Sequence, residues 1–268
     1  MGGKAPGSSM AGPDEDERYR APALDKGLDI LELLAGTEEG LSQAEIAKAL
    51  ARSPNEIYRM LDRLVRRRYV LRTAAERYEL SLKMFELAHA RPPIQRLVSQ
   101  SLPPMRRFAR AAEQSCHLVI HDRNVLVVAA QVESPNYWGV SIRVGARMSP
   151  AGTGSGHVFL AHASAEERSL MLEAEGNGTG EILTPALLQR LDLVRTRGYE
   201  DMESLQTRGV LNLSAPVWGP AGTVLAVLTC PYTEPIDRRE APHHDAVLAL
   251  LLATANEISR RDDGATGF

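Results

Sequence analysis

Residues 41–65 have the sequence LSQAEIAKALARSPNEIYRMLDRLV, and this stretch decides the fold of the N-terminal part of the chain. Ser42 and Glu45 form a capping-box pattern, in which the serine oxygen accepts from the third helical amide and the glutamate reaches back to the cap amide. Ser53 and Glu56 repeat the pattern a short distance further on. Two short capped helices joined by such a tight turn predict a helix-turn-helix.

The flanking segments predict a winged form of this domain. An apolar stripe at helical spacing over 24–34 predicts one more helix before the capped pair. Residues 69–72 and 77–80 have the pattern of two short strands around a tight turn, which is the wing. We therefore expect a winged helix-turn-helix domain over 22–82. A leader over 1–21, rich in Gly, Pro, Ser and acidic residues, is expected to be disordered.

A helical linker is expected over 83–114. Residues 81–90 have a helical pattern that ends at Arg91-Pro92-Pro93, because proline lacks a backbone donor and restricts the residue before it. Helical periodicity resumes over 94–114, with an interruption predicted at Pro103-Pro104. The linker is therefore predicted to consist of helical segments that can pivot at these prolines.

The pattern changes to strands beyond the linker. We expect a second domain over 115–261 and a disordered tail over 262–268. Strands paired in hairpins, with helices between them, predict an α+β fold with a largely antiparallel sheet. The predicted strands cover 118–120, 125–132, 140–144, 210–217 and 223–230, and the predicted helices cover 152–162, 166–175, 185–197 and 241–261.

Composition limits the classes of function. The chain has 268 residues, of which 44% are hydrophobic, and a net charge of −3, so contact with nucleic acid requires a local basic patch. No run of about 18 apolar residues predicts a membrane span and no apolar signal core precedes the first domain, so we expect a cytoplasmic protein. Cys116 and Cys230 have no metal-like spacing. His117 and His121, on a strand, and His243-His244-Asp245, at a helix start, are not expected to bind metal, and no cofactor is expected.

The helix-turn-helix carries a basic patch of this kind. Residues 52–77 contain eight arginines against three acidic residues, a local net charge of +5. Arginine suits phosphate because its planar fork donates two parallel hydrogen bonds. In the first turns of a recognition helix, Asn can pair with adenine, Arg with guanine, and Glu can accept from cytosine. The candidate DNA contacts are Ser42, Gln43, Arg52, Ser53, Asn55, Glu56, Tyr58, Arg59, Arg63 and Arg77.

Each of these assignments has a simpler alternative. An arginine run alone is more often a solvated helix face than a binding site, but here two capping boxes, a tight turn and a wing accompany it. Tyr58 fits equally well as a packing residue. Glu56 fits either as a reader of cytosine or solely as the capping partner of Ser53.

The order of these motifs resembles the IclR family of transcription regulators, named for the isocitrate lyase regulator. The resemblance runs from about residue 22 to residue 260, and IYRMLDRL at 57–64 is its strongest segment. Other matching segments are ALDKGLDIL at 23–31, LSQAEIA at 41–47, RYEL at 77–80, Val144-Gly145, GSGHVFLA at 154–161, Gly198-Tyr199, Gly209-Val210 and SAPV at 214–217.

The resemblance implies a winged helix-turn-helix, a linker helix and a GAF-like effector domain, assembled as dimers or tetramers on palindromic operators. The turn before the recognition helix departs from the family pattern, so the operator sequence is not implied. The effector pocket departs as well. Met202 stands where many relatives have Asp, Asn212 replaces a Cys, and Leu228 and Cys230 stand at two Ser positions.

The segment Gly152-Thr153-Gly154-Ser155-Gly156 precedes a predicted helix and is the candidate acid-binding segment. Free amides and the positive end of the helix dipole bind carboxylates, and glycine lets a ligand approach the backbone closely. The alternative is a loop that needs glycine only for its own geometry. The candidate effector residues are Thr153, Gly154, Ser155, Gly156, Met202, Asn212, Leu228 and Cys230.

The replaced positions bear on the chemistry of the effector. Because Met202, Leu228 and Cys230 replace more polar groups, we expect a partly apolar organic acid, aromatic or branched. Tyr137 and Trp138 fit as lining of the pocket or of a loop over it, and equally as surface or core residues.

The sequence thus predicts a ligand-responsive transcription regulator, a repressor or an activator, that binds double-stranded DNA as a homodimer or homotetramer. One alternative is an enzyme that acts on a small acid through the second domain. It would need a nucleophile and a base, and Ser155 and His157 have no spacing that supports this. The other alternative is a DNA-binding protein that ignores ligands, against which the glycine-rich helix start argues.

Overall fold

The computed structural model describes residues 21–89, 92–122, 124–173, 182–220, 222–237 and 240–263. The chain divides into two compact units, Met1–Arg91 and Pro92–Phe268. All but the last residue of the predicted leader lies outside the described residues, as does 264–268 of the predicted tail. The other two residues of that tail, Asp262 and Asp263, belong to the last helix, so that part of the prediction is wrong.

The first unit is a three-stranded sheet with helices: the two strands of the wing and the capped helices were predicted, whereas the short strand at Leu41–Ser42 was not. The strands lie antiparallel in the order β1-β3-β2. Apolar residues of three helices and two strands form one core, which includes Ile30, Ile46, Ile57, Leu61 and Val70. The elements are α2 Pro22–Ala35, β1 Leu41–Ser42, α3 Gln43–Ala49, α4 Pro54–Arg66, β2 Val70–Arg72, β3 Arg77–Leu80 and α5 Lys83–His89.

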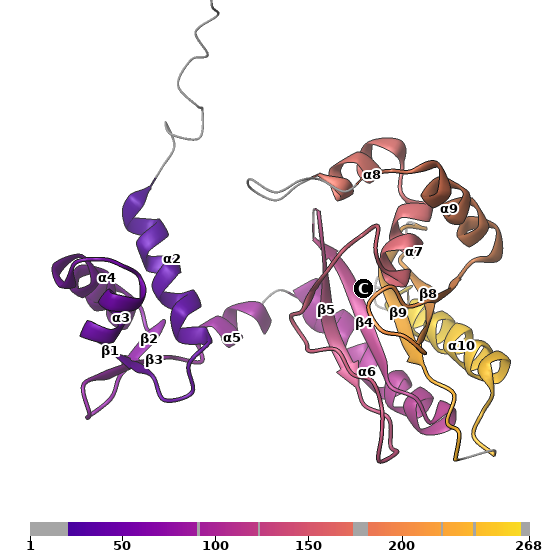
Figure 1. Cartoon of the computed structure of the whole chain (residues 1–268), viewed down its shortest axis with the longest axis horizontal. Coiled ribbons are helices and arrows are strands. Elements are labelled where there is room, and N and C mark those ends of the chain that lie inside the picture. The colour runs from indigo at the N-terminus through magenta and orange to yellow at the C-terminus, as the bar shows by residue number, and fades with distance from the viewer. Residues whose placement is uncertain are drawn as a thin grey trace, which may run out of the picture. The chain divides into compact units, whose positions relative to one another are not determined.

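The second unit is built on a six-stranded antiparallel sheet with the order β6-β5-β4-β9-β8-β7. Figure 1 shows its four central strands, β5, β4, β9 and β8, side by side. The predicted α+β class is confirmed. The strands are β4 Cys116–Asp122, β5 Val125–Val132, β6 Arg147–Met148, β7 Glu200–Glu203, β8 Leu211–Trp218 and β9 Val224–Tyr232. The helices are α6 Pro92–Ala112, α7 Gly154–His162, α8 Ala165–Leu172, α9 Pro185–Arg197 and α10 His244–Asp263.

The two faces of this sheet carry separate cores. On one face, α6 and α10 pack over Leu118, Leu213, Ala215 and Leu228. On the other face, α7 and α9 lie over a cluster that includes Val119 and Val227, which are next to residues of the first core in the sequence. Successive residues of a regular strand point to opposite faces, so neighbours in the sequence join different cores, and the bulge in the β4–β5 pairing changes the face between Val128 and Ala130 of β5.

Helix α6 runs without a break from Pro92 to Ala112, so the predicted interruption at Pro103-Pro104 is wrong. A proline inside a helix removes one ladder hydrogen bond and clashes with the preceding turn. However, α6 buries Leu97 before the prolines and Met105 and Phe108 after them in a single core. Tertiary burial therefore holds the helix together, and the prolines do not act as a pivot.

Two strand predictions also need correction. The predicted strand 140–144 is a loop, whose Val140 carbonyl accepts from the Ser115 hydroxyl instead of from a neighbouring strand. The strand that pairs with β5 comes slightly later, as β6. The edge strand β7 was not predicted, because three of its four residues are acidic and strands are usually depleted of acidic residues.

Candidate nucleic-acid interface and effector site

Both predicted capping boxes form in the first unit. The Glu45 amide donates to the Ser42 hydroxyl at 3.3 Å, and the Ser42 amide donates to the Glu45 carboxylate at 2.7 Å. Ser53 and Glu56 make the same two bonds at 3.4 and 3.2 Å. In the turn between the two helices, Ala51 has φ of 49°, a left-handed conformation that glycine adopts more easily.

The exposed side of α4 carries three polar residues in a row. Asn55, Arg59 and Arg63 follow one another at intervals of four residues, opposite the buried Ile57 and Leu61. Within the described residues, their side chains make no hydrogen bond or ion pair. Three exposed, unpaired side chains on one helix face are available to a nucleic acid. We call Asn55, Arg59 and Arg63 the α4 stripe.

Other predicted DNA contacts already have partners inside the unit. The Glu56 carboxylate lies 2.5 Å from the Lys26 ammonium, and this hydrogen bond, with those from Ser53, lowers the pKa of Glu56 to about 2. Arg77 donates to the carbonyls of Glu39 and Gly40 and pairs with Glu45 at 3.3 Å. The charged groups of Glu56 and Arg77 are therefore engaged in contacts within the first unit.

The other five candidate DNA contacts include capping residues, residues with weaker partners and one exposed aromatic residue. Gln43 donates to the Pro54 carbonyl at 3.0 Å and so joins α3 to α4, and Arg52 lies 3.8 Å from the Asp29 carboxylate. Ser42 and Ser53 act as caps. Tyr58 is 57% exposed, so the alternative of a packed core residue does not hold.

In the second unit, α7 begins with two amides that have no partner among the described residues. Thr153 is the cap: its hydroxyl accepts from the Gly156 amide at 3.1 Å, and its carbonyl accepts from the His157 amide at 3.0 Å. The amides of Gly154 and Ser155 remain unpaired at the positive end of the helix dipole. This is the geometry that binds carboxylates.

The start of α7 packs tightly against the loop before it and against β8. A side chain at Gly156 would place its Cβ 1.9 Å from the Pro150 carbonyl oxygen, and one at Gly154 would lie 2.8 Å from the Ser214 hydroxyl. The glycines therefore serve the close approach of two backbone segments, which was the simpler alternative for them. That role is compatible with free amides at the same place.

A chain of three buried hydroxyls lies between α7 and the sheet. The Ser155 and Thr229 hydroxyls are 2.8 Å apart, and Thr229 donates to Ser214 at 2.9 Å. Thr229 and Ser214 are direct partners in the β8–β9 pairing, so they lie on the face that α7 covers. Thr229 and Ser214 were not among the predicted site residues.

Strand pairing divides the four predicted pocket residues of the sheet. Asn212 lies on the α7 face, because a Cβ at Gly154 would be 3.2 Å from its Cβ, and Met202 is its direct partner on β7. Leu228 and Cys230 belong to the opposite core, under α6 and α10. They point away from α7, so they do not lie beside the predicted acid-binding segment. The residues of β9 that face α7 are Val227 and Thr229.

A buried ionic network lies beside the hydroxyl chain. The Glu200 carboxylate, 1% exposed, accepts from the His157 Nδ1 at 2.7 Å and from Arg190 at 2.7–3.0 Å. Burial alone raises the pKa of Glu200, but the hydrogen bonds from His157 and Arg190 outweigh it and lower the pKa. The His157 Nε2 lies 2.9 Å from the Ala151 carbonyl oxygen, so the ring ties the loop before α7 to β7. Because both ring nitrogens are used, His157 does not pair with Ser155 as a catalytic base.

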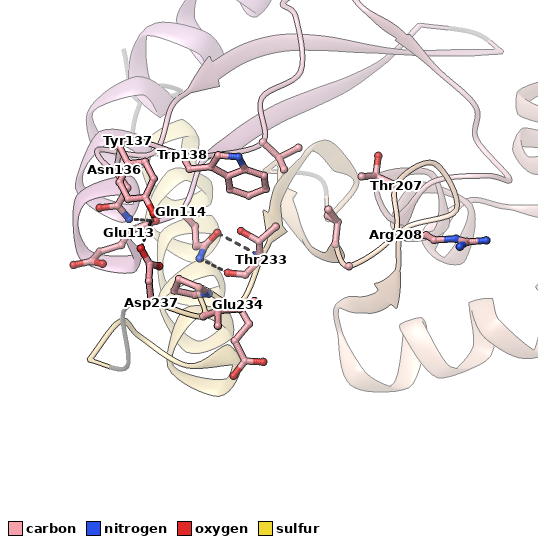
Figure 2. Close-up of a pocket in the computed structure, with 15 residues that line it drawn as sticks. Glu113, Gln114, Asn136, Tyr137, Trp138, Thr207, Arg208, Thr233, Glu234 and Asp237 are labelled. Atoms are coloured by element: carbon pink, nitrogen blue, oxygen red, sulfur yellow. Dashed lines mark hydrogen bonds between the residues drawn. The ribbon is translucent and has the colours of Figure 1, made fainter.

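A separate pocket of about 530 Å³ lies at one end of the sheet (Figure 2). Tyr137 and Trp138 line it, and none of the eight predicted effector residues does. Some of its polar groups have partners: Gln114 bonds both backbone groups of Thr233, and the Tyr137 hydroxyl lies 2.5 Å from the Asp237 carboxylate. The two aromatic residues therefore lie on a pocket wall, away from the residues predicted for the acid.

The fold and these sites define a DNA-binding transcription regulator with a separate effector domain. The chain belongs to the IclR family: the family description "Bacterial transcriptional regulator IclR C-terminal" matches residues 94–260, and "IclR helix-turn-helix domain" matches residues 23–74. Both domains are those of regulators, so the enzyme alternative is excluded. No helix within the described residues is long and apolar enough to cross a membrane.

Known regulators resemble the chain over nearly its whole length. It is 28% identical over 256 residues to the HTH-type transcriptional regulator KdgR of Escherichia coli (strain K12), which covers 93% of this chain and 96% of that relative. The HTH-type transcriptional regulator BhcR of Paracoccus denitrificans is 28% identical over 249 residues, 90% of this chain and 88% of that relative.

Solved structures of the family share the fold. An IclR homologue from Microbacterium hydrocarbonoxydans, crystallised with 4-hydroxybenzoate, has a TM-score of 0.74 at 20% identity and covers 91% of this chain and 100% of its own. The Thermotoga maritima IclR has a TM-score of 0.68 at 22% identity, with 91% and 100% covered.

Proposed function

We propose that this regulator binds a palindromic operator as a dimer, and that a small organic acid bound at the start of α7 changes its affinity for DNA. The observation that carries the proposal is the pair of unpaired amides of Gly154 and Ser155 at a capped helix N-terminus, in a domain whose family role is effector binding. A ligand changes DNA affinity only if it binds the DNA-competent and DNA-incompetent states unequally.

On the DNA side, the α4 stripe is the proposed reading surface. Arg59 and Arg63 are exposed and unpaired within the described residues, as phosphate or guanine contacts require. Asn55 lies in the first turn of α4, from which a recognition helix reaches base edges. Ser53, Tyr58 and Arg52 stay as peripheral candidates. Glu56 and Arg77 are removed from the proposal, because their charges are already paired.

Dimerisation follows from the size of one reading helix. One helix-turn-helix covers only a half-site, so specific binding needs two copies spaced by the operator. Helix α2 leaves Leu24 61% exposed and Leu28 47% exposed, and apolar residues of that size support a subunit contact. Sedimentation of Leu24→Glu beside the unmodified chain tests this contact. A dimer that persists in the variant places the contact elsewhere.

On the effector side, the proposed acid contacts are the amides of Gly154 and Ser155, with Met202 and Asn212 beside them. Leu228 and Cys230 are removed, because they face the other core. One structurally similar homologue was crystallised with 4-hydroxybenzoate. An aromatic acid therefore belongs in the first panel of compounds.

Footprinting of the chain on the DNA upstream of its own gene tests the function. We expect a protected palindrome, and at least one acid of a panel of aromatic, branched, keto and hydroxy acids should change the protection. Protection that no acid alters would support a regulator that ignores ligands. Absence of any protected sequence would contradict the reading role of the α4 stripe on that DNA.

A further inference from the structure

His117 is a buried imidazole without a partner. It lies on β4 and is only 1% exposed, and neither Nδ1 nor Nε2 has a hydrogen-bond partner among the described residues. Buried polar side chains in folded proteins are nearly always hydrogen-bonded, because desolvating a polar group without compensation is costly. An imidazole with two idle nitrogens therefore indicates a group that is to be supplied from outside the chain.

The register of the sheet places His117 on the α7 face. Its neighbours Cys116 and Leu118 belong to the core under α6 and α10, so alternation turns His117 to the other side. Its direct partner on β9 is Thr229, whose hydroxyl reaches Ser155 at the start of α7. Directly opposed residues of antiparallel strands have Cβ atoms about 5 Å apart. His117 is thus next to the proposed acid site.

A second idle polar atom lies on the other side of His117. Gln131 on β5 is its direct partner in the β4–β5 pairing and shares its face. The Gln131 Nε2 donates to the Val132 carbonyl at 3.1 Å, whereas its Oε1 is buried and has no partner among the described residues. Two neighbouring strands therefore offer the same region an acceptor from Gln131 and an unpartnered imidazole.

The protonation state of His117 decides which ligand group fits. Burial lowers the pKa of His117 to about 4, so the ring is neutral at physiological pH, with one N–H donor and one acceptor nitrogen. A second carboxylate could use only the donor. A hydroxyl group both donates and accepts, so it complements a neutral imidazole beside an amide oxygen.

We propose that His117 and Gln131 bind an uncharged hydroxyl of the effector, whose carboxylate occupies the amides of Gly154 and Ser155, so that the effector is a hydroxycarboxylic acid. The inference rests on the proposed function, because it takes the acid site at α7 as given. It also revises the polarity expected of the ligand. Leu228 and Cys230 leave the site, and His117, Gln131, Ser214 and Thr229 enter it, so the site is more polar than the sequence predicted.

Calorimetric titration of the full chain with matched pairs of acids tests the proposal. Each pair differs by one hydroxyl: propanoate and 2-hydroxypropanoate, butanoate and 3- or 4-hydroxybutanoate, phenylacetate and 4-hydroxyphenylacetate. We expect at least one hydroxy acid to bind about tenfold or more tightly than its partner without the hydroxyl. His117→Phe should reduce that preference to about twofold or less, while the affinity for the acid without the hydroxyl stays close to that of the unmodified chain.

Two further variants make the result specific. His117→Asn keeps a donor and an acceptor in a smaller side chain and should retain part of the preference, which also covers the case in which His117→Phe fails to fold. His121→Phe is the control: it changes an exposed histidine of the same strand, which contacts the Phe159 ring, and should leave the preference unchanged.

The outcomes separate the two proposals. Acids that bind without any preference for a hydroxyl, or a preference that survives both His117 variants, would overturn the assignment of His117 while leaving the acid site intact. If no acid of the panel binds, the acid site and the hydroxyl assignment fail together. Binding that responds to His117 but is insensitive to the carboxylate, measured with the corresponding amides, would overturn the acid site alone.

Discussion

The ammonium of Lys26 on α2 lies 2.5 Å from the carboxylate of Glu56 in the first turn of α4. The same carboxylate completes the capping box with Ser53, so one side chain both caps the start of α4 and links α4 to α2. The orientation of α4 relative to α2 therefore depends on an ion pair that is itself partly exposed.

Lys26→Met should loosen α2 and the start of α4. Exposed ion pairs weaken with salt, so the effect on amide hydrogen exchange of α4 should be larger at low than at high ionic strength.

Because the folded-state pKa of Glu56, about 2, lies below its ordinary value of 4.5, the stabilisation that the Glu56 carboxylate contributes is complete above about pH 4.5 and is lost as the pH falls toward 2. Lys48→Met, at an exposed lysine of α3, is the control. Equal effects of the two variants would contradict the role of the pair.

Arg59→Ala and Arg63→Ala should each reduce the salt dependence of DNA binding. A lost phosphate contact lowers the slope of log K against log salt by about 0.9. Arg66→Ala is a matched control, because Arg66 is already paired with Asp62 at 2.9 Å. Fluorescence anisotropy over a range of salt concentrations gives all three slopes. Slopes equal to that of the unmodified chain would show that the α4 stripe does not contact phosphate.

Ala51→Gly should stabilise the helix-turn-helix by about 1 kcal/mol, because a left-handed alanine carries a steric cost that glycine lacks. Ala49→Gly, at an exposed position of α3, should instead destabilise by roughly 0.5–1 kcal/mol. Denaturant unfolding followed by circular dichroism measures both. A loss of stability in both variants would mean that the turn gains nothing from glycine.

His117 should make stability depend on pH in a defined window. The unfolded chain takes up a proton at His117 near pH 6.5, whereas the folded chain does so only near pH 4, so lowering the pH between these values favours unfolding. The loss is at most about 3 kcal/mol. The unfolding free energy of the unmodified chain minus that of His117→Phe should become smaller as the pH falls from 7 to 4, because only the unmodified chain carries the titrating imidazole. Parallel curves would indicate that His117 titrates normally.

Leu228→Ser and Thr229→Val should act on different properties although they are adjacent. Leu228 is fully buried under α6 and α10, so its replacement should destabilise by about 2–5 kcal/mol without changing which acids bind. Thr229→Val keeps the shape and removes the hydroxyl that Ser155 contacts, so it should change acid affinity with a smaller loss of stability. Calorimetry and thermal unfolding separate the two. A change of ligand preference in Leu228→Ser would contradict the face assignment.

The parts of the fold that local rules control were predictable from the sequence. The two capping boxes formed as predicted, because a cap depends on residues three apart in the chain. The β8–β9 hairpin and the helix that starts at Gly154 also formed close to their predicted bounds. The continuous α6 was not predictable in this way, because its prolines are outweighed by burial against segments distant in sequence.

The candidate site was harder to predict for a different reason. The family resemblance gave Met202, Asn212, Leu228 and Cys230 as site residues, but in the structure only Asn212 and its strand partner Met202 are placed beside α7, whereas Leu228 and Cys230 lie on the opposite face of the sheet. His117 and Gln131 gave no motif at all. Their places opposite Thr229 and each other follow only from the pairing of β4 with β9 and β5.

The alternation of faces also means that substitutions in one strand act on two different properties, stability or ligand preference, according to the face that the residue occupies. On β8 and β9, residues that hold the core under α6 and α10 alternate with residues that face α7. With the proposed acid site at the start of α7, we expect substitutions at Asn212, Ser214 or Thr229 to change ligand preference while the intervening positions keep the domain folded. Single substitutions at every second residue of β8 and β9 are therefore expected to change the ligand specificity without unfolding the domain. A combinatorial library confined to those positions should yield a high share of folded variants.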